Sequence, residues 1–348
     1  MDPPRRILLI RPSALGDVCR SVPILATLRA AYPHAQIDWL VQDTFAPAIE
    51  CHSALSGVVA FPRRRLARAF TPAGLADFFD WSACLSDPNY DLVIDAQGLA
   101  RSGLLAAMTG ATTRLGYANA QEAAAVFYTH RVRVPRSMHA VDRMVTLVCE
   151  GLGIPGVPDM RLHADPCLLL RLPRGPELVA TPFIVLAPTS RWPAKRWPAD
   201  RFASLARHLL DLPSAGAPLI ALIGAPSERD QCAPLLELAS REPRVVDLIG
   251  ATSVASLMSL IQRAALVVAN DSAPLHMAVG FDRPIVALFG PTDISRVGPY
   301  QRGRDVLQHL LPGDTLDHKL DDNVGLMHRI GVDEVLAACR SRVAWPRL

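Results

Sequence analysis

The sequence Arg6-Ile-Leu-Leu-Ile-Arg11-Pro-Ser13-Ala-Leu-Gly16-Asp17-Val18, near the amino terminus, predicts the fold. An aliphatic run at residues 7–10 ends in a short polar turn, and an apolar helical pattern then covers residues 18–31. Such a run, bounded by turn residues, is typical of a strand that is buried on both faces of a parallel sheet. The stretch therefore predicts a strand that leads through a turn into a helix.

The same alternation continues along most of the chain. Helical patterns recur at 138–151, 200–210 and 254–263. Further aliphatic runs lie at 37–41, 58–61, 92–94, 132–134, 183–187, 219–223, 245–249, 266–268 and 285–289. Strands that alternate with helices in this way predict a doubly wound α/β architecture with parallel sheets.

The chain has 348 residues, which suggests two domains. The alternation pauses in a proline-rich stretch, which predicts a linker at 161–182 between an N-terminal domain (1–160) and a C-terminal domain (183–330). The segment 331–348 is expected to contain a helix that packs back on the first domain. Two Rossmann-like domains of this kind would face each other across a cleft, where ligands preferentially bind.

Composition argues against several classes of protein. The 36 basic and 33 acidic residues leave a formal net charge of +3, which is low for a nucleic-acid-binding protein. The 7 cysteines are spread singly without a CxxC pair, which argues against disulfides and zinc knuckles and favours a reducing compartment. No apolar run reaches the ~20 residues that span a bilayer. We therefore expect a soluble, cytoplasmic protein.

The turn after the first aliphatic run supplies the first candidate site. In an open α/β sheet the carboxyl ends of the strands line the ligand crevice, so Asp17 is expected at its mouth, with Ser13 and Gly16 beside it. Asp17 has two interpretations. It could stabilise the first turn of a helix, or it could act as a general base that accepts a proton from a hydroxyl.

A second candidate site follows the run at 266–268, where a helix opens with Asn270-Asp271-Ser272-Ala273-Pro274-Leu275-His276. The free N–H groups of a first helical turn form an anion site, and Asp271 could hold a sugar hydroxyl. The alternative is a well-capped helix with His276 in the core.

A third candidate site follows the run at 183–187. Thr189, Ser190 and Lys195 could bind a diphosphate, and Lys195 and Lys319 are the only lysines of the chain. Glu228, which follows the next aliphatic run, either reaches the same pocket or lies on a solvated surface.

Two loops offer acceptor-binding candidates. Arg63-Arg64-Arg65, with Arg68, follows one aliphatic run, and Gln97 and Arg101 lie in the stretch Asp95-Ala-Gln97-Gly98-Leu-Ala-Arg101 after another. Arg63 and Arg64 could meet an acidic acceptor. A solvated surface is the alternative for such a charge run.

Several catalytic motifs do not occur in the sequence: a Walker A loop, HExxH, GxSxG and the D-x-D of metal-dependent sugar transferases. Residues 151–156 match GxGxxG formally, but no strand precedes them, so they are rejected as a dinucleotide fingerprint. We therefore expect no metal site and no bound cofactor.

Short motifs are spread over nearly the whole chain. They are Ser13-Ala-Leu-Gly-Asp17, Val93-Ile-Asp95-Ala-Gln-Gly-Leu99, Phe127-Tyr128, His139-Ala-Val-Asp142-Arg143, Lys195-Arg-Trp-Pro198, Asn270 to His276, and Phe289-Gly-Pro-Thr-Asp293. Taken together and in this order, they resemble glycosyltransferase family 9, the heptosyltransferases of lipopolysaccharide core assembly, and especially those of type I.

This resemblance implies a GT-B fold, in which one Rossmann-like domain binds the acceptor and the other binds the nucleotide sugar. It implies an inverting, metal-independent transfer of heptose from ADP-heptose to an acidic sugar of a lipid-linked acceptor. Asp17 matches the family's catalytic base, and Lys195 matches its diphosphate ligand. Residues 271–276 match the donor-binding stretch, and Arg63 and Arg64 match acceptor-facing arginines.

The chain departs from the family pattern at three places. The loop before Lys195 is slightly longer than in the family, so the roles of Thr189 and Ser190 stay open. Ala273 stands where the family has glycine, and Ala120-Gln121-Glu122 stands where an Arg-Glu pair is often found, so the acceptor stays open. Two other functions also stay open: a nucleotide-sugar epimerase or hydrolase, and a non-catalytic nucleotide-sugar-binding protein. No nucleic-acid partner is expected. A lipid-linked acceptor would bring the protein into peripheral contact with the inner face of the inner membrane, and the oligomeric state stays open.

Overall fold

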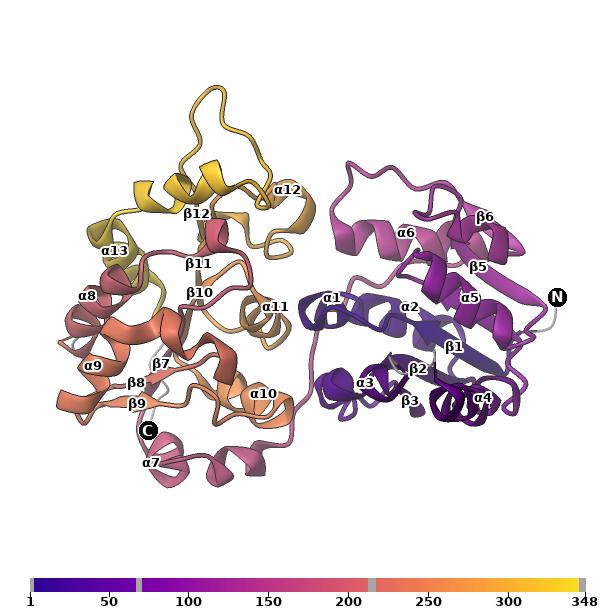
Figure 1. Cartoon of the computed structure of the whole chain (residues 1–348), viewed down its shortest axis with the longest axis horizontal. Coiled ribbons are helices and arrows are strands. Elements are labelled where there is room, and N and C mark those ends of the chain that lie inside the picture. Colours follow the sequence, from indigo (N-terminus) through magenta and orange to yellow (C-terminus); the bar gives the residue numbers. More distant parts are fainter. Residues whose placement is uncertain (1–2, 67–70, 212–216, 344–348) are drawn as a thin grey trace. The chain divides into compact units, whose positions relative to one another are not determined.

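The computed structural model describes residues 3–66, 71–211 and 217–343 (Figure 1). The chain forms two compact units, Met1–His163 and Ala164–Leu348. Each unit contains one six-stranded sheet whose strands all pair in parallel. The predicted doubly wound α/β architecture is therefore confirmed within each unit.

The sheet of the first unit has the strand order β3-β2-β1-β4-β5-β6. Its central strand β1 pairs with β2 on one side and with β4 on the other, so that Ile7 lies opposite Ile37 and Leu92. The strands are β1 (Arg6–Ile10), β2 (Gln36–Gln42), β3 (Gly57–Phe61), β4 (Leu92–Asp95), β5 (Thr113–Tyr117) and β6 (His130–Val132). The α-helices are α1 (Leu15–Arg20), α2 (Val22–Ala31), α3 (Arg63–Leu66), α4 (Pro72–Ser86), α5 (Ala100–Met108) and α6 (Ala140–Leu152).

The sheet of the second unit repeats this topology in the order β12-β11-β10-β7-β8-β9. Its strands are β7 (Phe183–Ala187), β8 (Leu219–Leu222), β9 (Val245–Asp247), β10 (Leu266–Asn270), β11 (Ile285–Leu288) and β12 (Val306–Leu307). The α-helices are α7 (Gly175–Ala180), α8 (Ala199–Leu210), α9 (Ala233–Arg241), α10 (Val254–Arg263), α11 (Ala273–Gly280), α12 (Ile294–Val297) and α13 (Val332–Arg342).

Short 3₁₀ helices complete the connections. In the first unit they are η1 (Asp43–Ala48) and η2 (Ala124–Phe127), and in the second they are η3 (Pro166–Arg171), η4 (Pro193–Lys195), η5 (Pro226–Cys232), η6 (Gly303–Asp305) and η7 (Asp321–Arg329).

Burial of the strands on both faces explains their continuous aliphatic runs. Leu8 and Ile10 of β1 pack into a core with Trp81 of α4 and Leu105 of α5. In the second unit, Ile184 of β7 belongs to a core that α8, α9 and α13 share. A strand that is covered by helices on both sides has no face on which polar residues are favoured.

The order of strands creates one reversal point in each sheet. In the first sheet it lies between β1 and β4, and in the second it lies between β7 and β10. The loops that leave two adjacent strands diverge at such a point, so a crevice opens at the carboxyl ends of those strands. Both reversal points coincide with candidate sites of the sequence.

The expected linker is structured and belongs to the second unit. Residues 164–182 include η3 and α7, and the side chains of Leu169 and Leu178 are buried. Ser259 of α10 donates a hydrogen bond to the carbonyl of Asp165, which ties this stretch to the second unit. The prolines interrupt the helical pattern, but the leucines between them are still buried, and η3 packs against α10. The expectation of a linker over 161–182 is therefore corrected.

The C-terminal helix also belongs to the second unit. Val335, Leu336 and Cys339 of α13 are buried in the same core as α8 and the central strands. This corrects the expectation that the helix packs back on the first domain. Of the predicted segment 331–348, residues 344–348 lie outside the described residues.

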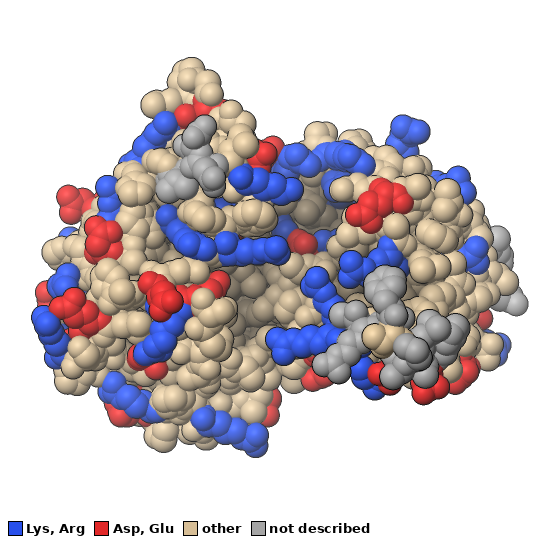
Figure 2. Space-filling model, viewed as in Figure 1, with Lys and Arg blue, Asp and Glu red and all other residues tan. Residues whose placement is uncertain are grey.

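Two further observations concern the molecule's surface. Among the described residues, no helix combines the length and the apolar character needed to cross a bilayer. On the face shown in Figure 2, basic and acidic side chains are interspersed over both units, in keeping with a formal net charge of only +3.

Candidate functional site

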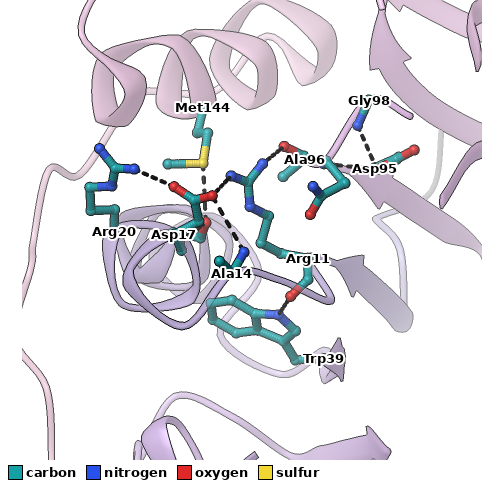
Figure 3. Close-up of polar contacts among 11 residues, drawn as sticks. Arg11, Ala14, Asp17, Arg20, Trp39, Asp95, Ala96, Gly98 and Met144 are labelled. Carbon is teal, nitrogen blue, oxygen red and sulfur yellow. Dashed lines mark hydrogen bonds and ion pairs between the residues drawn. The ribbon is translucent and has the colours of Figure 1, made fainter. Parts of the chain in front are cut away.

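In the first unit, Asp17 lies between two guanidinium groups. It occupies the first turn of α1, just beyond the carboxyl end of β1, and its side chain is 28% exposed. Arg11 Nη2 lies 3.0 Å from Asp17 Oδ2, and Arg20 forms an ion pair with Oδ1. Figure 3 shows the two arginines on opposite sides of the carboxylate. The position therefore combines a partly exposed carboxylate with two charges that keep it oriented.

The two arginines are held in turn by the protein. Arg11 Nη1 donates to the carbonyl of Ala96 at 2.6 Å, so the end of β1 is joined to the end of β4 (Figure 3). The side chains of Arg11 and Arg20 are only 13% and 10% exposed. Neither arginine was identified as a site residue from the sequence. Arg20 follows Asp17 by three residues, and this helical spacing is the signal that could have identified it.

Beside this site, Asp95 closes the turn after β4. The carboxylate is fully buried and accepts hydrogen bonds from Tyr128 Oη at 2.6 Å and from the Gln97 and Gly98 amides at 2.8 and 3.1 Å. Gly98 has φ of +72°, a conformation that glycine adopts without steric cost. Burial raises the pKa of Asp95, although these hydrogen bonds oppose the shift. Asp95 thus shapes the loop that carries the candidate Gln97.

The predicted acceptor residues are brought together in part. Ser13, Arg63, Gln97 and Arg101 line a cavity of about 120 Å³ in the first unit. Arg64 is exposed on α3, and Gly16 lies within α1; neither lines this cavity. Arg68 lies outside the described residues. The cavity presents two guanidinium groups, together with two hydroxyls, from Ser13 and Ser102, and two amides, from Gln42 and Gln97.

In the second unit, the turns after β7 and β10 meet at a cavity of about 420 Å³. Eight predicted donor residues line it: Thr189, Ser190, Lys195, Glu228, Asp271, Ser272, Ala273 and Pro274. Two further parts of the wall were not anticipated from the sequence. These are Trp192 and the segment with Thr252, Ser253, Val254 and Leu257. That segment follows the carboxyl end of β9, so the rule that singled out the other turns could have found it.

A short ion pair lies in the wall of this cavity. Lys195 Nζ donates to Asp271 Oδ2 at 2.6 Å, and the two side chains are 13% and 8% exposed. Asn270, the last residue of β10, is fully buried and anchors both turns: its amide donates to the Pro188 carbonyl at 2.7 Å and its oxygen accepts from the Trp197 amide at 3.1 Å. The ion pair is therefore set in a rigid frame.

Glu228 is a member of this cavity and does not lie on a solvated surface. Its Oε2 accepts from Thr189 Oγ1 at 2.7 Å and from the Ala225 amide at 2.9 Å. These bonds connect the turn after β7 to the turn after β8. A carboxylate that bridges two turns shapes the cavity and also leaves oxygen lone pairs that could accept hydroxyl groups.

Two predicted donor residues lie elsewhere. Leu275 and His276 are 0% and 4% exposed, and the cavity wall is formed without their side chains. The amide of Leu275 donates to the Ser272 carbonyl at 3.2 Å. Leu275 and His276 are the third and fourth residues of α11, and their side chains are buried because the helix packs on β10 and β11. The side chain of His276 is therefore buried in the core, as the alternative interpretation of the sequence expected.

The described residues contain no group of three or more His, Cys, Asp or Glu side chains that could hold a metal ion. Two basic side chains, Arg191 and Lys195, line the cavity of the second unit.

Comparisons with known proteins agree with this architecture. The sequence model described as glycosyltransferase family 9 (heptosyltransferase) matches residues 82–315. Lipopolysaccharide heptosyltransferase 1 of Salmonella typhimurium is 28% identical over 309 residues, which are 86% of this chain and 92% of that protein.

Two solved structures are also similar over nearly the whole chain. The structure of E. coli heptosyltransferase WaaC with ADP has a TM-score of 0.77 and 26% identity, and covers 97% of this chain and 99% of its own. The structure of the same enzyme with ADP-2-deoxy-2-fluoro heptose has a TM-score of 0.71 and 27% identity, and covers 93% of this chain and 99% of its own. These similarities confirm the predicted GT-B fold.

Proposed function

Because this chain belongs to glycosyltransferase family 9, we propose that it transfers heptose from ADP-heptose to an acidic sugar of the lipopolysaccharide core, with inversion at the anomeric carbon. The Salmonella typhimurium relative is named for heptosyl transfer in lipopolysaccharide, and the two solved structures of the E. coli relative hold ADP and a fluorinated ADP-heptose. These similarities support both the sugar and the nucleotide of the donor.

The cavity of the second unit is the observation that carries the proposal. Its volume of about 420 Å³ lies within the range of nucleotide and cofactor sites. One part of the wall is apolar, with Ile223, Val254 and Leu257, and suits a flat base. Another part holds the Lys195–Asp271 pair, in which an ammonium group suits a diphosphate and a carboxylate suits sugar hydroxyls.

In the proposed reaction, Asp17 takes the proton from the acceptor hydroxyl as that oxygen attacks the anomeric carbon. The nucleoside diphosphate leaves from the opposite face, which inverts the configuration. General-base assistance of this kind is worth roughly 10²–10⁴ in rate. Arg11 and Arg20 hold the carboxylate in a fixed orientation, and the proposed step needs the ionised form of that carboxylate to accept the proton.

Charge develops on the departing diphosphate, and Lys195 is positioned in the cavity to offset it. A helix N-terminus contributes only about 0.3–1 kcal/mol at an exposed site, so α11 alone would stabilise the leaving group weakly. An ammonium group already held by Asp271 needs little reorganisation when charge appears. We propose that this residue supplies the electrostatic stabilisation and that the transfer requires no cofactor.

The acceptor side of the proposal rests on the cavity of the first unit. Arg63 and Arg101 present two guanidinium groups, whose planar geometry matches a carboxylate. An acidic sugar is therefore the proposed acceptor. Such a sugar on a lipid would require the protein to work at the inner face of the inner membrane.

Replacement of Asp17 tests the proposed chemistry. Asp17→Asn keeps the size of the side chain but removes the base, so heptosyl transfer should fall at least ~10²-fold. Binding of ADP, measured by titration calorimetry, should change little because the nucleotide site lies in the second unit. Asp87→Asn, at an exposed aspartate of the same unit, is the matched control and should transfer at the rate of the unsubstituted protein.

Two outcomes would contradict the proposal. Near-normal transfer by the Asp17→Asn variant would remove Asp17 from the chemistry. Release of free heptose at the full rate without any acceptor would favour the hydrolase interpretation over a transferase.

A further inference from the structure

A segment that is remote in sequence from the lining residues reaches the wall of the second unit's cavity, which is the proposed donor cavity. The imidazole of His318, in the stretch between β12 and η7, meets the ring of Trp192 edge-on, with ring centroids 5.3 Å apart and an interplanar angle of 65°. Trp192 itself lines the cavity and directly precedes η4, in the connection that follows β7. His318 is only partly exposed. It is therefore in contact with the nucleotide site while lying outside the motifs of the sequence.

The stretch that carries His318 is anchored on both sides. Before it, Gln308 Nε2 donates to the carbonyls of Gly290 and Thr292 at 2.7 and 2.8 Å. After it, Asn323 Nδ2 donates to the Asp317 carbonyl at 2.6 Å. An ion pair between Asp314 and Arg329 joins the stretch to η7. These contacts give the imidazole a defined place.

Charges from the cavity act on this imidazole. Partial burial and the nearby Lys195 ammonium lower the pKa of His318, and Lys319 adds to this effect, whereas the carboxylates of Asp271 and Asp317 oppose it. The free protein therefore favours the neutral imidazole at pH 7. Two negative charges arriving beside Lys195 would reverse the balance, because an anion stabilises a protonated histidine.

We propose that His318 is a further donor-binding residue, whose imidazole takes up one proton from solvent when a nucleoside diphosphate enters the cavity and then donates a hydrogen bond to a phosphate oxygen. This inference rests on the proposed function, since it needs a diphosphate in that cavity. The step is a proton transfer: a ring nitrogen gains an N–H bond as hydronium or a buffer acid loses the same proton, and no bond between heavy atoms changes. The imidazolium then assists Lys195 in holding the diphosphate as it leaves the sugar.

The sign of the pH dependence follows from this linkage. The diphosphate binds the protonated imidazole more tightly than the neutral one, so its affinity falls as the pH rises through the pKa of His318 in the complex. Proton uptake on binding is largest between the pKa of the free protein and that of the complex. A neutral side chain at position 318 would show neither effect.

The experiment uses the full chain and ADP as the probe. Titration calorimetry at pH 6.5 in two buffers of different ionisation enthalpy measures the protons taken up on binding. The variants are His318→Gln, His318→Phe, which keeps a ring beside Trp192, and the control His208→Gln at an exposed histidine of α8. ADP itself exchanges protons on binding. The role of His318 is therefore judged from the difference in proton uptake between each His318 variant and the His208→Gln control.

Both His318 variants should take up fewer protons than His208→Gln does and should bind ADP about tenfold more weakly at pH 6.5, with the difference shrinking at pH 8.5. Equal proton uptake and equal affinity in all proteins would overturn the role of His318 and leave the proposed function standing. Failure of ADP to bind the unsubstituted protein and the control would overturn both.

Discussion

Lys195 carries three N–H donors, and Asp271 accepts one of them at 2.6 Å. A phosphate can therefore be bound by the remaining donors without breaking the ion pair, while Asp271 stays available to sugar hydroxyls. The pair is also costly to disrupt. Both side chains are largely buried, and removal of one partner leaves the other charge without compensation.

Replacement of Lys195 should accordingly weaken nucleotide binding. Lys195→Ala removes a charge-assisted hydrogen bond to the diphosphate, so ADP affinity measured by calorimetry should fall about tenfold to a hundredfold. Arg207→Ala removes an exposed basic side chain of α8 in the same unit and should change the affinity by less than about threefold. Equal losses in the two variants would indicate a general effect of net charge and contradict the proposed contact.

Asp17 illustrates what residue spacing can reveal. The strand-turn-helix pattern was sufficient to place it at the end of β1, and the structure does so. The pattern did not indicate that Arg11 and Arg20 hold its two oxygens. The i,i+3 position of Arg20 could have been read from the sequence, whereas the route of Arg11 to the Ala96 carbonyl depends on the pairing of β1 with β4.

Among the elements, α13 is tied to the edge of the second sheet by one buried carboxylate. Asp305 is 5% exposed and accepts from Arg302 Nε at 2.6 Å and from Arg342 Nε of α13 at 2.9 Å. Burial would raise the pKa of Asp305, but the two arginines outweigh this effect and hold the pKa below the ordinary 3.8. The carboxylate of Asp305 therefore links α13 to the rest of the second unit.

Asp305→Asn should destabilise the protein by about 2 kcal/mol, because two guanidinium groups lose their charged partner. The free energy of unfolding from denaturant titration measures the change. Glu237→Gln breaks an exposed ion pair with Arg241 and should change stability by less than about 0.5 kcal/mol.

The same carboxylate sets a pH dependence with a definite sign. Since the pKa of Asp305 is lowered in the folded state, its contribution is complete above pH 3.8 and is lost as the pH falls through the folded-state pKa. Unsubstituted protein and Asp305→Asn should therefore converge in stability under acid. A constant difference down to pH 2 would contradict this linkage.

At the scale of the whole molecule, the residues that line the proposed donor cavity all belong to the second of the two units. A ligand that binds only the native state stabilises it by about 2.7 kcal/mol at one hundred times its Kd. For ADP this stabilisation should act first on the second unit. Amide protons of the segments around the cavity should therefore exchange more slowly when ADP is bound.

Hydrogen exchange measured with and without ADP should show the largest protection at 187–195, 223–228, 252–257 and 271–274, the segments that line the cavity. Residues 42, 61, 97, 99, 101 and 102, which line the cavity of the first unit, are the internal reference. Equal or greater protection of that reference would contradict a nucleotide site in the second unit.

The alternation of aliphatic runs with helical patterns was enough to predict two doubly wound units, because a strand buried on both faces must be apolar throughout. The connections that follow those runs likewise supplied Asp17, Lys195 and Asp271 as candidate site residues. The same local reasoning wrongly expected a linker at 161–182 and wrongly attached the last helix to the first domain, because it could not tell against which surface leucines pack.

Contacts between remote segments emerged from the folded chain alone. Lys195 meets Asp271 across 76 positions and Thr189 meets Glu228 across 39. His318, in the stretch between β12 and η7, contacts Trp192, in the connection after β7. Parallel pairing brings the carboxyl ends of β7, β8 and β10 to one edge of a sheet. Local composition carries no information about those distances, since they arise from strand order and packing.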